Sequence, residues 1–343
     1  MNPLVSIAAS HIRDILAGAI KRTPQERVVV IYDLECGLSK IMAEAYREAI
    51  PDGQFINFAE TNAAAILTLI DALSPGDVFV LVQSNSFRLN EFRIRIELFK
   101  RKLKAIEHVH LNRMSEEQYA TWIDALAFDK EYLQSRGLGL KKALDHAGTI
   151  KMVGKDTELV WVGSTGSPCM EEAKLNIGDY TGMENIGGTF PIGEVFTEAR
   201  DFLRVNGTLR IYAFAGDDFI VRFHEPFLAT VVAGILEPGS DAPEEFKKLI
   251  DLIRADERVL VRELGVGLNR AISREKPVND ITAFERVLGL HLSLGEKHGV
   301  YKKPGLIPTK TRYHIDVFPA FERLEIDGRV VFDNTLAANQ ILV

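Results

Sequence analysis

Three apolar runs near the start of the chain, separated by two stretches with helical spacing, constrain the fold more than any other feature. The first run, residues 28–32, is apolar at every position, as expected of a strand buried on both faces. Helical periodicity follows at residues 38–49 and 63–73, alternating with further strand-like runs at 54–58 and 77–82. This β-α-β-α-β order predicts a parallel sheet whose crossover connections are right-handed.

The turn after the first run, residues 33–39, carries no nucleotide-binding motif. It contains neither GxGxxG nor GxxxxGK[ST], so neither a dinucleotide site nor a P-loop is expected there. Asp33 and Glu35 follow the end of a strand, where ligands of such sheets bind. Capping of the next helix explains these two acids more simply than a cleft does.

Helical patterns continue to residue 146 and then stop. Residues 115–146 predict two helices, and Gly137 with Gly139 is expected to break the second one. One more helix is predicted at residues 242–255.

From Thr149 onward, short alternating strands dominate, among them separate strands at 219–223 and 228–236. A chain of 343 residues has the length of two domains. We therefore predict an α/β domain with a mostly parallel sheet at residues 1–148, followed by an α+β, mostly antiparallel domain at residues 149–343.

Charge and cysteine content exclude several classes of protein. The formal net charge is −7 with the acidic excess spread along the chain, which argues against a nucleic-acid partner. The one basic stretch, residues 93–104, spaces its apolar residues so that the charges fall on the solvated face of a helix. Cys36 and Cys169 are far apart and lack metal-site spacing, so neither a disulfide framework nor a zinc ribbon is expected.

The first 22 residues predict an amphipathic helix. His11, Arg13 and Asp14 interrupt its apolar positions, so a signal peptide is not expected. No apolar run in the sequence has the length of a membrane span. We expect no membrane partner and take the cytoplasm as the default location.

Two acids in the second half follow glycine-rich segments. Residues 185–197 form a Gly/Pro-rich loop that leads to Glu194 at the start of an apolar strand. Residues 262–269 contain Glu263 followed by alternating glycines, which permit close approach of backbone. Either acid taken alone would more often be a solvated surface residue.

Two further segments place imidazoles on strand faces. In residues 290–295 the alternation puts His291 and Ser293 opposite the leucines, and in residues 311–318 it puts His314 and Asp316 on one face. A single histidine of this kind is more often a core residue or a member of a satisfied surface pair than a ligand. An imidazole beside a carboxylate is nevertheless what a divalent metal or a general base requires.

The four segments together resemble a known family. PxGEVFT, ELGxGxN, HxxLG and HxD, in this order and with comparable separations, resemble the aminopeptidase T, aminopeptidase S and PepS family of dinuclear metallo-aminopeptidases. Residues 205–208 and 154–159 match supporting parts of that pattern. The resemblance is specific from about Thr149 to Asp316, and over the first half it covers only the order of strands and helices. It implies the thermophilic-type metalloprotease fold, which dihydroxypyridine dioxygenases share.

The resemblance implies a site with two divalent ions, zinc, cobalt or manganese, bridged by at least one carboxylate and a water. The residues that fall on the family's metal ligands are Glu194, Glu263, His291, His314 and Asp316. The ions would activate the water, polarise the scissile carbonyl and fix the substrate's free amino end. Glu194 and Glu263 are also the candidates for the general base, and the sequence does not decide between them.

The chain departs from the family at one position of interest. The family has a tyrosine seven residues after the first histidine, and this chain has His298 there, with Tyr301 and Tyr313 as displaced candidates. The segment between His298 and Tyr313 is also shortened. If the family tyrosine stabilises the oxyanion, His298 or Tyr301 is expected to act in its place.

We therefore expect a metal-dependent aminopeptidase-like hydrolase acting on peptides or small molecules. An alternative is a ring-cleaving dioxygenase-like enzyme with a single iron held by His291, His314 and Asp316. A second alternative is a non-catalytic relative that serves as a scaffold or a biosynthetic partner. A homodimer is implied by the resemblance alone.

Overall fold

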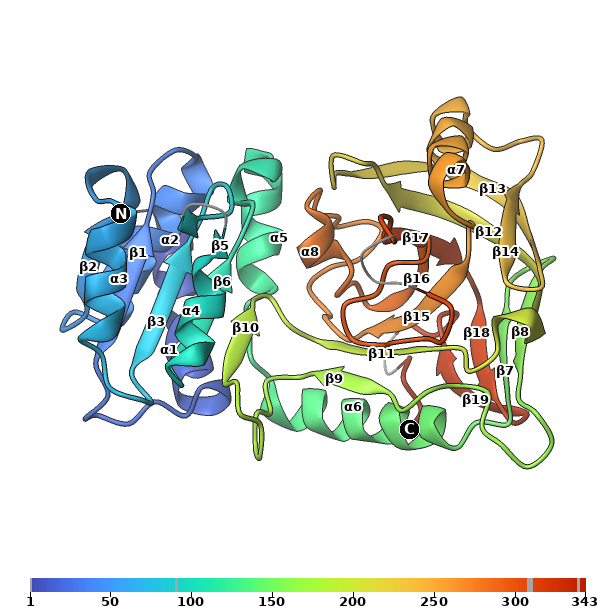
Figure 1. Cartoon of the computed structure of the whole chain (residues 1–343), viewed down its shortest axis with the longest axis horizontal. Coiled ribbons are helices and arrows are strands. Elements are labelled where there is room, and N and C mark those ends of the chain that lie inside the picture. The colour runs from blue at the N-terminus through green and yellow to red at the C-terminus, as the bar shows by residue number, and fades with distance from the viewer. Residues whose placement is uncertain (1, 90–91, 307–310, 338–339) are drawn as a thin grey trace. The chain divides into compact units, whose positions relative to one another are not determined.

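The computed structural model describes residues 2–89, 92–306, 311–337 and 340–343, which form two compact units (Figure 1). The first unit comprises Met1–Leu133, Ile177–Gly193 and Asn269–Phe284, and the second unit comprises Gln134–Asn176, Glu194–Leu268 and Glu285–Val343. Each unit is thus assembled from three segments. The domain boundary predicted between residues 148 and 149 stays a prediction.

The first unit is built on a five-stranded sheet in the order β10-β6-β3-β1-β2, and its strand pairs are parallel. The parallel sheet predicted from the alternating runs is therefore present. Its strands are β1 (Val28–Tyr32), β2 (Gln54–Asn57), β3 (Val78–Val82), β6 (Lys104–His108) and β10 (Gly187–Thr189), and β4 (Arg88–Leu89) forms a separate antiparallel pair with β5 (Phe92–Arg93). Its helices are α1 (Pro3–Asp14), α2 (Gly37–Ala49), α3 (Ala63–Asp71), α4 (Ile94–Lys100), α5 (Tyr119–Asp124) and α8 (Ile281–Phe284).

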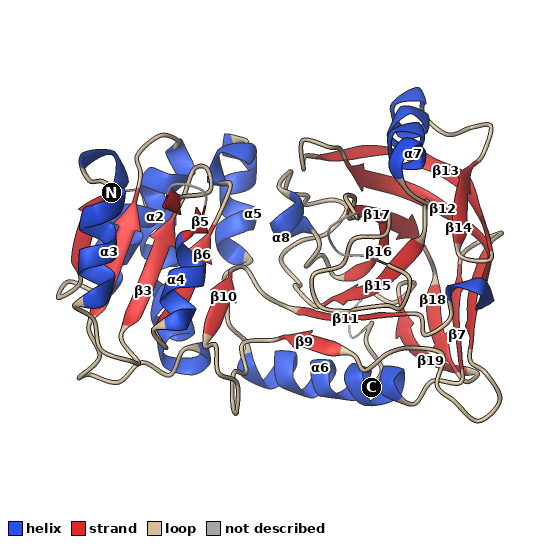
Figure 2. Cartoon of the chain, viewed as in Figure 1, coloured by secondary structure: helices blue, strands red, loops and turns tan. Residues whose placement is uncertain are grey.

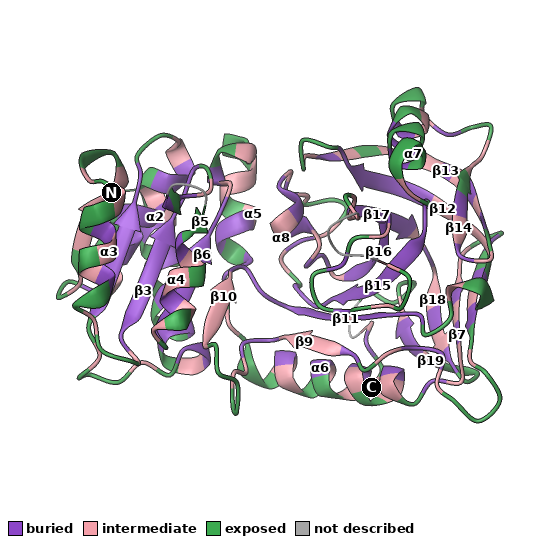
Figure 3. Ribbon diagram, in the orientation of Figure 1, coloured by how far each residue is buried: buried purple, intermediate pink, exposed green. Residues whose placement is uncertain are grey.

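The core of this unit follows from the apolar runs. Every residue of β1 and β3 is buried, and their side chains pack with those of α3 and α4 (Figure 3). Cys36 and Ser39 form a capping box at the start of α2, and Asn62 caps α3. Because Cys36 caps this helix through its side chain, the turn at residues 33–39 has a structural role.

One strand of the parallel sheet was not predicted. β10 comes from the glycine-rich stretch expected to be a loop, and it pairs with β6 through Gly187↔Ala105 and Thr189↔Glu107. Gly187 has φ +101°, and a Cβ atom there would lie 1.9 Å from the carbonyl oxygen of Ala105. This edge strand therefore requires a residue without a side chain.

The second unit is dominated by a twelve-stranded antiparallel sheet (Figure 2). Its main path runs β19-β18-β7-β8-β12-β17-β16-β15-β11-β9; off this path, β13 pairs with β12, and β14 pairs with β13. Its strands are β7 (Thr149–Val153), β8 (Glu158–Val162), β9 (Lys174–Asn176), β11 (Glu194–Glu198), β12 (Val205–Ala215), β13 (Val221–Val232), β14 (Ile235–Pro238), β15 (Val261–Gly267), β16 (Gly289–Leu294), β17 (Ile315–Ala320), β18 (Arg323–Ile326) and β19 (Arg329–Asp333). Its helix α7 spans Glu244–Asp256, and α6 (Lys130–Asp145) belongs to it from Gln134 onward.

Three local predictions were wrong. Helix α6 continues through Gly137 and Gly139 instead of breaking there. The two strands expected at 219–223 and 228–236 are a single long strand, β13, followed by β14. Lys104 does not lie on a solvated helix face but begins the buried strand β6, where its Nζ is 2.7 Å from Oε1 of Glu26.

Among the described residues, none of the helices combines the length and the apolar character that crossing a bilayer requires.

Candidate metal centre

Neighbouring strands of the antiparallel sheet bring the predicted ligands together. Glu194 is the first residue of β11, Glu263 lies in β15, His291 in β16 and Asp316 in β17. These strands are adjacent in the order β17-β16-β15-β11, so residues far apart in sequence meet across the sheet. His314 immediately precedes β17. The five predicted metal ligands therefore gather in one region of the second unit.

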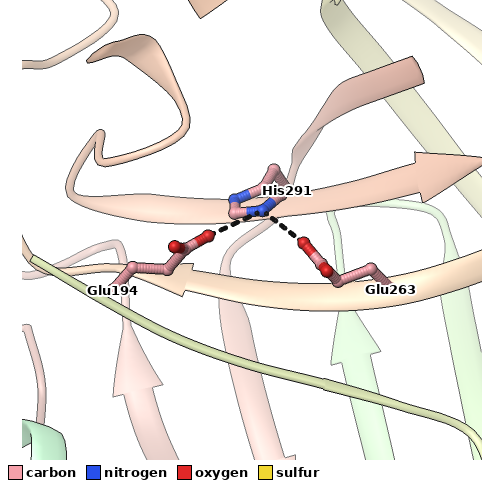
Figure 4. Close-up of side chains that lie close together, drawn as sticks. All are labelled: Glu194, Glu263 and His291. Atoms are coloured by element: carbon pink, nitrogen blue, oxygen red, sulfur yellow. Dashed lines mark hydrogen bonds and ion pairs between the residues drawn. The ribbon is translucent and has the colours of Figure 1, made fainter. Parts of the chain in front are cut away.

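Three of the side chains form a first group of candidate ligands (Figure 4). Nε2 of His291 is 3.2 Å from Oε1 of Glu194 and 3.2 Å from Oε1 of Glu263. All three residues are buried. We call them the His291 group. The three ligand atoms lie within 4.8 Å of one another, which is compact enough for one cation.

A second group shares Glu263. It consists of Glu263, His314 and Asp316, again with ligand atoms within 4.8 Å of one another, and we call it the His314 group. Nε2 of His314 is 3.4 Å from Oδ1 of Asp316, and Nδ1 of His314 is 3.1 Å from the carbonyl oxygen of Lys297. Donation by Nδ1–H to that carbonyl leaves Nε2 directed at the acids, an arrangement typical of metal-binding histidines.

The two glycines that follow Glu263 create the space for this cluster. Gly265 faces His291 across β15 and β16, and a Cβ atom there would lie 2.0 Å from Cε1 of the imidazole. Gly267 faces Glu194, and a Cβ atom there would lie 1.9 Å from the carbonyl oxygen of Val287. The alternating glycines are therefore explained by packing against the site.

Hydrogen bonds and charges shift the ionisation of the shared acid and the histidines. Burial alone would raise the pKa of Glu263, but hydrogen bonds from His291 and His298 and the charge of His314 lower it below its ordinary value. Burial alone would lower the pKa of His291, but hydrogen bonds to Glu194 and Glu263 raise it well above its ordinary value. The pKa of His314 is raised to about 10, because the charge of Asp316 outweighs the effect of burial.

The donor set and one unsatisfied atom fit a bound cation. Carboxylate and imidazole ligands suit zinc, cobalt and manganese. Oδ1 of Asp316 is buried and has no hydrogen-bond partner among the described residues, which is costly for a carboxylate without a cation. A divalent ion would neutralise the acids in place of the protons on His291 and His314.

His298 also reaches the cluster. Its Nε2 is 2.6 Å from Oε2 of Glu263, and its Nδ1 accepts from the backbone N–H groups of Val300 and Tyr301 at 3.0 and 3.3 Å. These acceptor contacts place the proton of the neutral imidazole on Nε2. His298 is therefore an N–H donor directed at the shared acid.

Tyr301 and Tyr313 are directed elsewhere. The hydroxyl of Tyr301 donates to the carbonyl oxygens of Glu172 and Phe196 at 2.7 and 3.2 Å. The hydroxyl of Tyr313 is 2.9 Å from Oδ2 of Asp256. The structure thus brings His298 to the acids, whereas both tyrosine hydroxyls make other contacts.

The sequence analysis missed a buried arginine beside the site. Nη1 of Arg286 is 2.7 Å from Oε2 of Glu194 and 2.7 Å from Oε1 of Glu285. Burial raises the pKa of Glu285 to about 8, and the acids Glu194 and Asp316 act in the same direction. A Glu-Arg pair among apolar residues, five residues before His291, was the signal available in the sequence.

A second buried ion pair supports the segment that carries His298. Nε of Arg262 is 2.8 Å from Oε2 of Glu198, and both side chains are almost fully buried. The same guanidinium donates to the carbonyl oxygens of Glu296 and Tyr301, on either side of His298. Arg262 therefore links β15 to this segment through charge-assisted hydrogen bonds.

Comparisons with known proteins bear on the fold. No protein-family model matches the chain, and no curated protein matches its sequence. Six chains of solved structures match it, among them one described as wild-type AmpT from Thermus thermophilus. That match has 13% sequence identity and a TM-score of 0.55, and it covers 94% of this chain and 95% of the other. At this identity the likeness shows that the two chains share a fold.

Proposed function

We propose that the chain is a metal-dependent hydrolase of the aminopeptidase type, which removes N-terminal residues from peptides. The observation that carries this proposal is the sharing of Glu263 by two ligand groups, the buried His291 group and the His314 group, in which only His314 is partly exposed. The family motifs on which the expectation was based coincide with these groups. The fold shared with AmpT agrees with the proposal.

Each group supplies three ligand atoms, so the cluster suits two divalent ions joined by one carboxylate. Two such ions would activate a water and polarise the scissile carbonyl. Glu263 would then bridge them, Glu194 and His291 would complete one subsite, and His314 with Asp316 would complete the other. The identity of the metal, zinc, cobalt or manganese, stays a prediction.

His298 is the proposed donor in place of the family tyrosine. Its Nε2–H already lies at the cluster, and the backbone N–H groups on Nδ1 hold it in that tautomer. A donor held in this way can hydrogen-bond an oxyanion that develops on the substrate. Tyr301 suits this role less well, because its hydroxyl is directed at two backbone carbonyls and not at the cluster.

A single-iron dioxygenase is the second candidate. It requires two histidines and one carboxylate around one ion. His291 and His314 fall in different groups, and each group contains two carboxylates and only one histidine. This distribution favours the hydrolase over the dioxygenase. A non-catalytic relative would bind metal but would turn over neither the peptide substrates nor the aromatic diol.

Hydrolysis of aminoacyl p-nitroanilides by the purified protein, together with its metal content, tests the proposal. Glu194→Ala and His314→Ala should each lose metal and activity. The control is His146→Ala, which replaces an exposed histidine that is not a candidate ligand and should lose neither. An N-acetylated substrate should resist cleavage, because the free amino end would be masked. Unchanged metal content in both ligand variants would refute the proposed centre.

Oxygen uptake separates the two enzyme classes. The iron-loaded protein should consume no oxygen with an aromatic diol if the chain is a hydrolase. Uptake that depends on His291 and His314 would favour the dioxygenase instead. The homodimer expected from the resemblance stays a prediction, which light scattering can test.

A further inference from the structure

A buried arginine makes a direct ion pair with one of the two ligand groups. Nη1 of Arg286 is 2.7 Å from Oε2 of Glu194, and its side chain is 8% exposed. In the His314 group, the ion pair that the described residues give Asp316 is with His314. The guanidinium keeps its charge at any physiological pH, whereas an imidazole gives up its proton to a metal.

The backbone holds Arg286 in this position. A Cβ atom on Gly267 would lie 2.7 Å from the carbonyl carbon of Arg286, so the two chain segments are in close contact. Gly267 in turn pairs with Glu194 across β15 and β11. The backbone of Arg286 therefore packs against the same glycine that pairs with Glu194, which brings the two residues together.

This contact affects the two groups unequally. Oε2 of Glu194 accepts from Arg286, whereas Oε1 is the oxygen near His291 and the cation position. The guanidinium is in direct contact with the His291 group, and among the described residues it acts on Asp316 of the His314 group only through its charge, beyond ion-pair distance. Glu285 also contacts Arg286, at 2.7 Å, but the raised pKa of its carboxyl makes it a weaker counter-ion for the guanidinium than Glu194.

We propose that Arg286 makes the two subsites unequal. The first divalent ion binds tightly to Glu263, His314 and Asp316, and the second ion binds weakly to the His291 group. Repulsion between the guanidinium and the second cation is the cause. Occupancy of the weaker subsite then follows the concentration of free metal. This inference rests on the proposed function, because it presupposes two ions.

Calorimetric titration of the metal-free full-length protein with Zn²⁺, in the presence of a competing chelator, tests the inference. We expect two dissociation constants that differ by about tenfold or more. Arg286→Lys should preserve the difference because it keeps the charge. Arg286→Gln should reduce the difference to about threefold or less by tightening the weaker constant. A difference that survives unchanged in a folded Arg286→Gln protein would overturn the inference.

Two variants of the metal ligands, which leave Arg286 unchanged, show which dissociation constant belongs to which subsite. Asp316→Asn should abolish the tighter constant, and Glu194→Gln, whose amide retains an oxygen toward Arg286, should abolish the weaker one. The reverse assignment would contradict the inference. Equal constants in the wild type would remove the inference and leave the proposed function standing, whereas no Zn²⁺ binding at all would remove both.

Discussion

The imidazole of His291 fills the space in which a side chain of Gly265 would lie. A Cβ atom on Gly265 would be 2.0 Å from Cε1 and 2.2 Å from Nε2 of that ring, and the two residues pair across β15 and β16. The ring therefore has its place over the strand only because the position opposite is a glycine. The same ring nitrogen lies 3.2 Å from two of the candidate metal-binding acids.

Replacement of Gly265 by alanine should displace His291 from the cluster. We expect loss of at least one bound metal ion and a fall in kcat/KM of roughly 100-fold or more, because a ligand shifted by about 1 Å no longer completes the site. Gly289→Ala is the matched control, since a Cβ atom there would meet its nearest neighbour at 3.9 Å. Metal analysis and kinetics of both proteins check the prediction. Full metal content in Gly265→Ala would contradict it.

His298 and Tyr301 should differ sharply when replaced. His298→Gln should reduce kcat by roughly 100-fold with metal content and KM little changed, because a donor to the developing oxyanion is lost or misplaced. Tyr301→Phe removes a hydroxyl that donates to two carbonyls, so it should lower the free energy of unfolding by about 1 kcal/mol and change kcat by less than about twofold. A larger loss of kcat in Tyr301→Phe than in His298→Gln would show that the roles are reversed.

Two neighbouring glycines of β10 should respond differently to alanine. Gly187 has φ +101°, and its Cβ would lie 1.9 Å from the carbonyl oxygen of Ala105, whereas Gly188 has nothing within 4 Å. Gly187→Ala should lower the free energy of unfolding by about 2 kcal/mol or more, and Gly188→Ala should change it by less than about 0.5 kcal/mol. Urea denaturation of the two variants measures both values. Equal effects would mean that β10 does not pair with β6 as described.

Acid should destabilise the first unit through His108. This imidazole is fully buried, where Nε2 lies 2.7 Å from the hydroxyl of Tyr46 and Nδ1 lies 3.3 Å from the carbonyl oxygen of Phe190. Burial lowers the pKa of His108 from 6.5 to about 4. The unfolded chain then binds the proton at a higher pH than the folded chain does. The stability that neutral His108 contributes is therefore present above about pH 6.5 and is lost as the pH falls toward 4.

Between pH 7.5 and pH 5, this loss should amount to about 2 kcal/mol of unfolding free energy. His108→Gln should show a correspondingly shallower dependence on pH. Trp122, whose ring centroid is 5.5 Å from that of His108, reports on this unit by fluorescence in a Trp161→Phe background, since the chain has two tryptophans. If the free energy of unfolding of the wild type and of His108→Gln falls equally between pH 7.5 and pH 5, His108 is not the source of the acid sensitivity.

Much of the fold could be predicted because its signals are local, and the cluster could be predicted because four motifs resemble those of a known family. A run that is apolar throughout, such as β1, indicates a strand buried on both faces wherever it lies in the sequence. Glu194, Glu263, His291, His314 and Asp316 were identified together, and the structure brings them into two groups that share one acid. Their role as metal ligands stays a prediction.

The features that were missed depend on contacts between distant segments. Arg286 is an ordinary charged residue in the sequence, and its contact with Glu194 follows from the alignment of β11 and β15 around Gly267. β10 has three residues and two glycines, so it lacks the apolar alternation by which strands are recognised. Gly139 was expected to break α6, but the backbone of Val343 packs against it. A Cβ atom on Gly139 would lie 2.8 Å from the carbonyl carbon of Val343. Tertiary packing overrides helix propensity at such a site.

Elemental analysis of the purified protein, beside its Glu263→Ala variant, tests the central claim most directly. Glu263 is the acid that both ligand groups share. After equilibration with excess divalent metal, the claim therefore predicts about two divalent ions per chain in the wild type and almost none in the variant. Circular dichroism spectra of the two proteins should coincide, which separates loss of ligands from loss of fold. Equal metal content in the two proteins, at any ratio, would contradict the account.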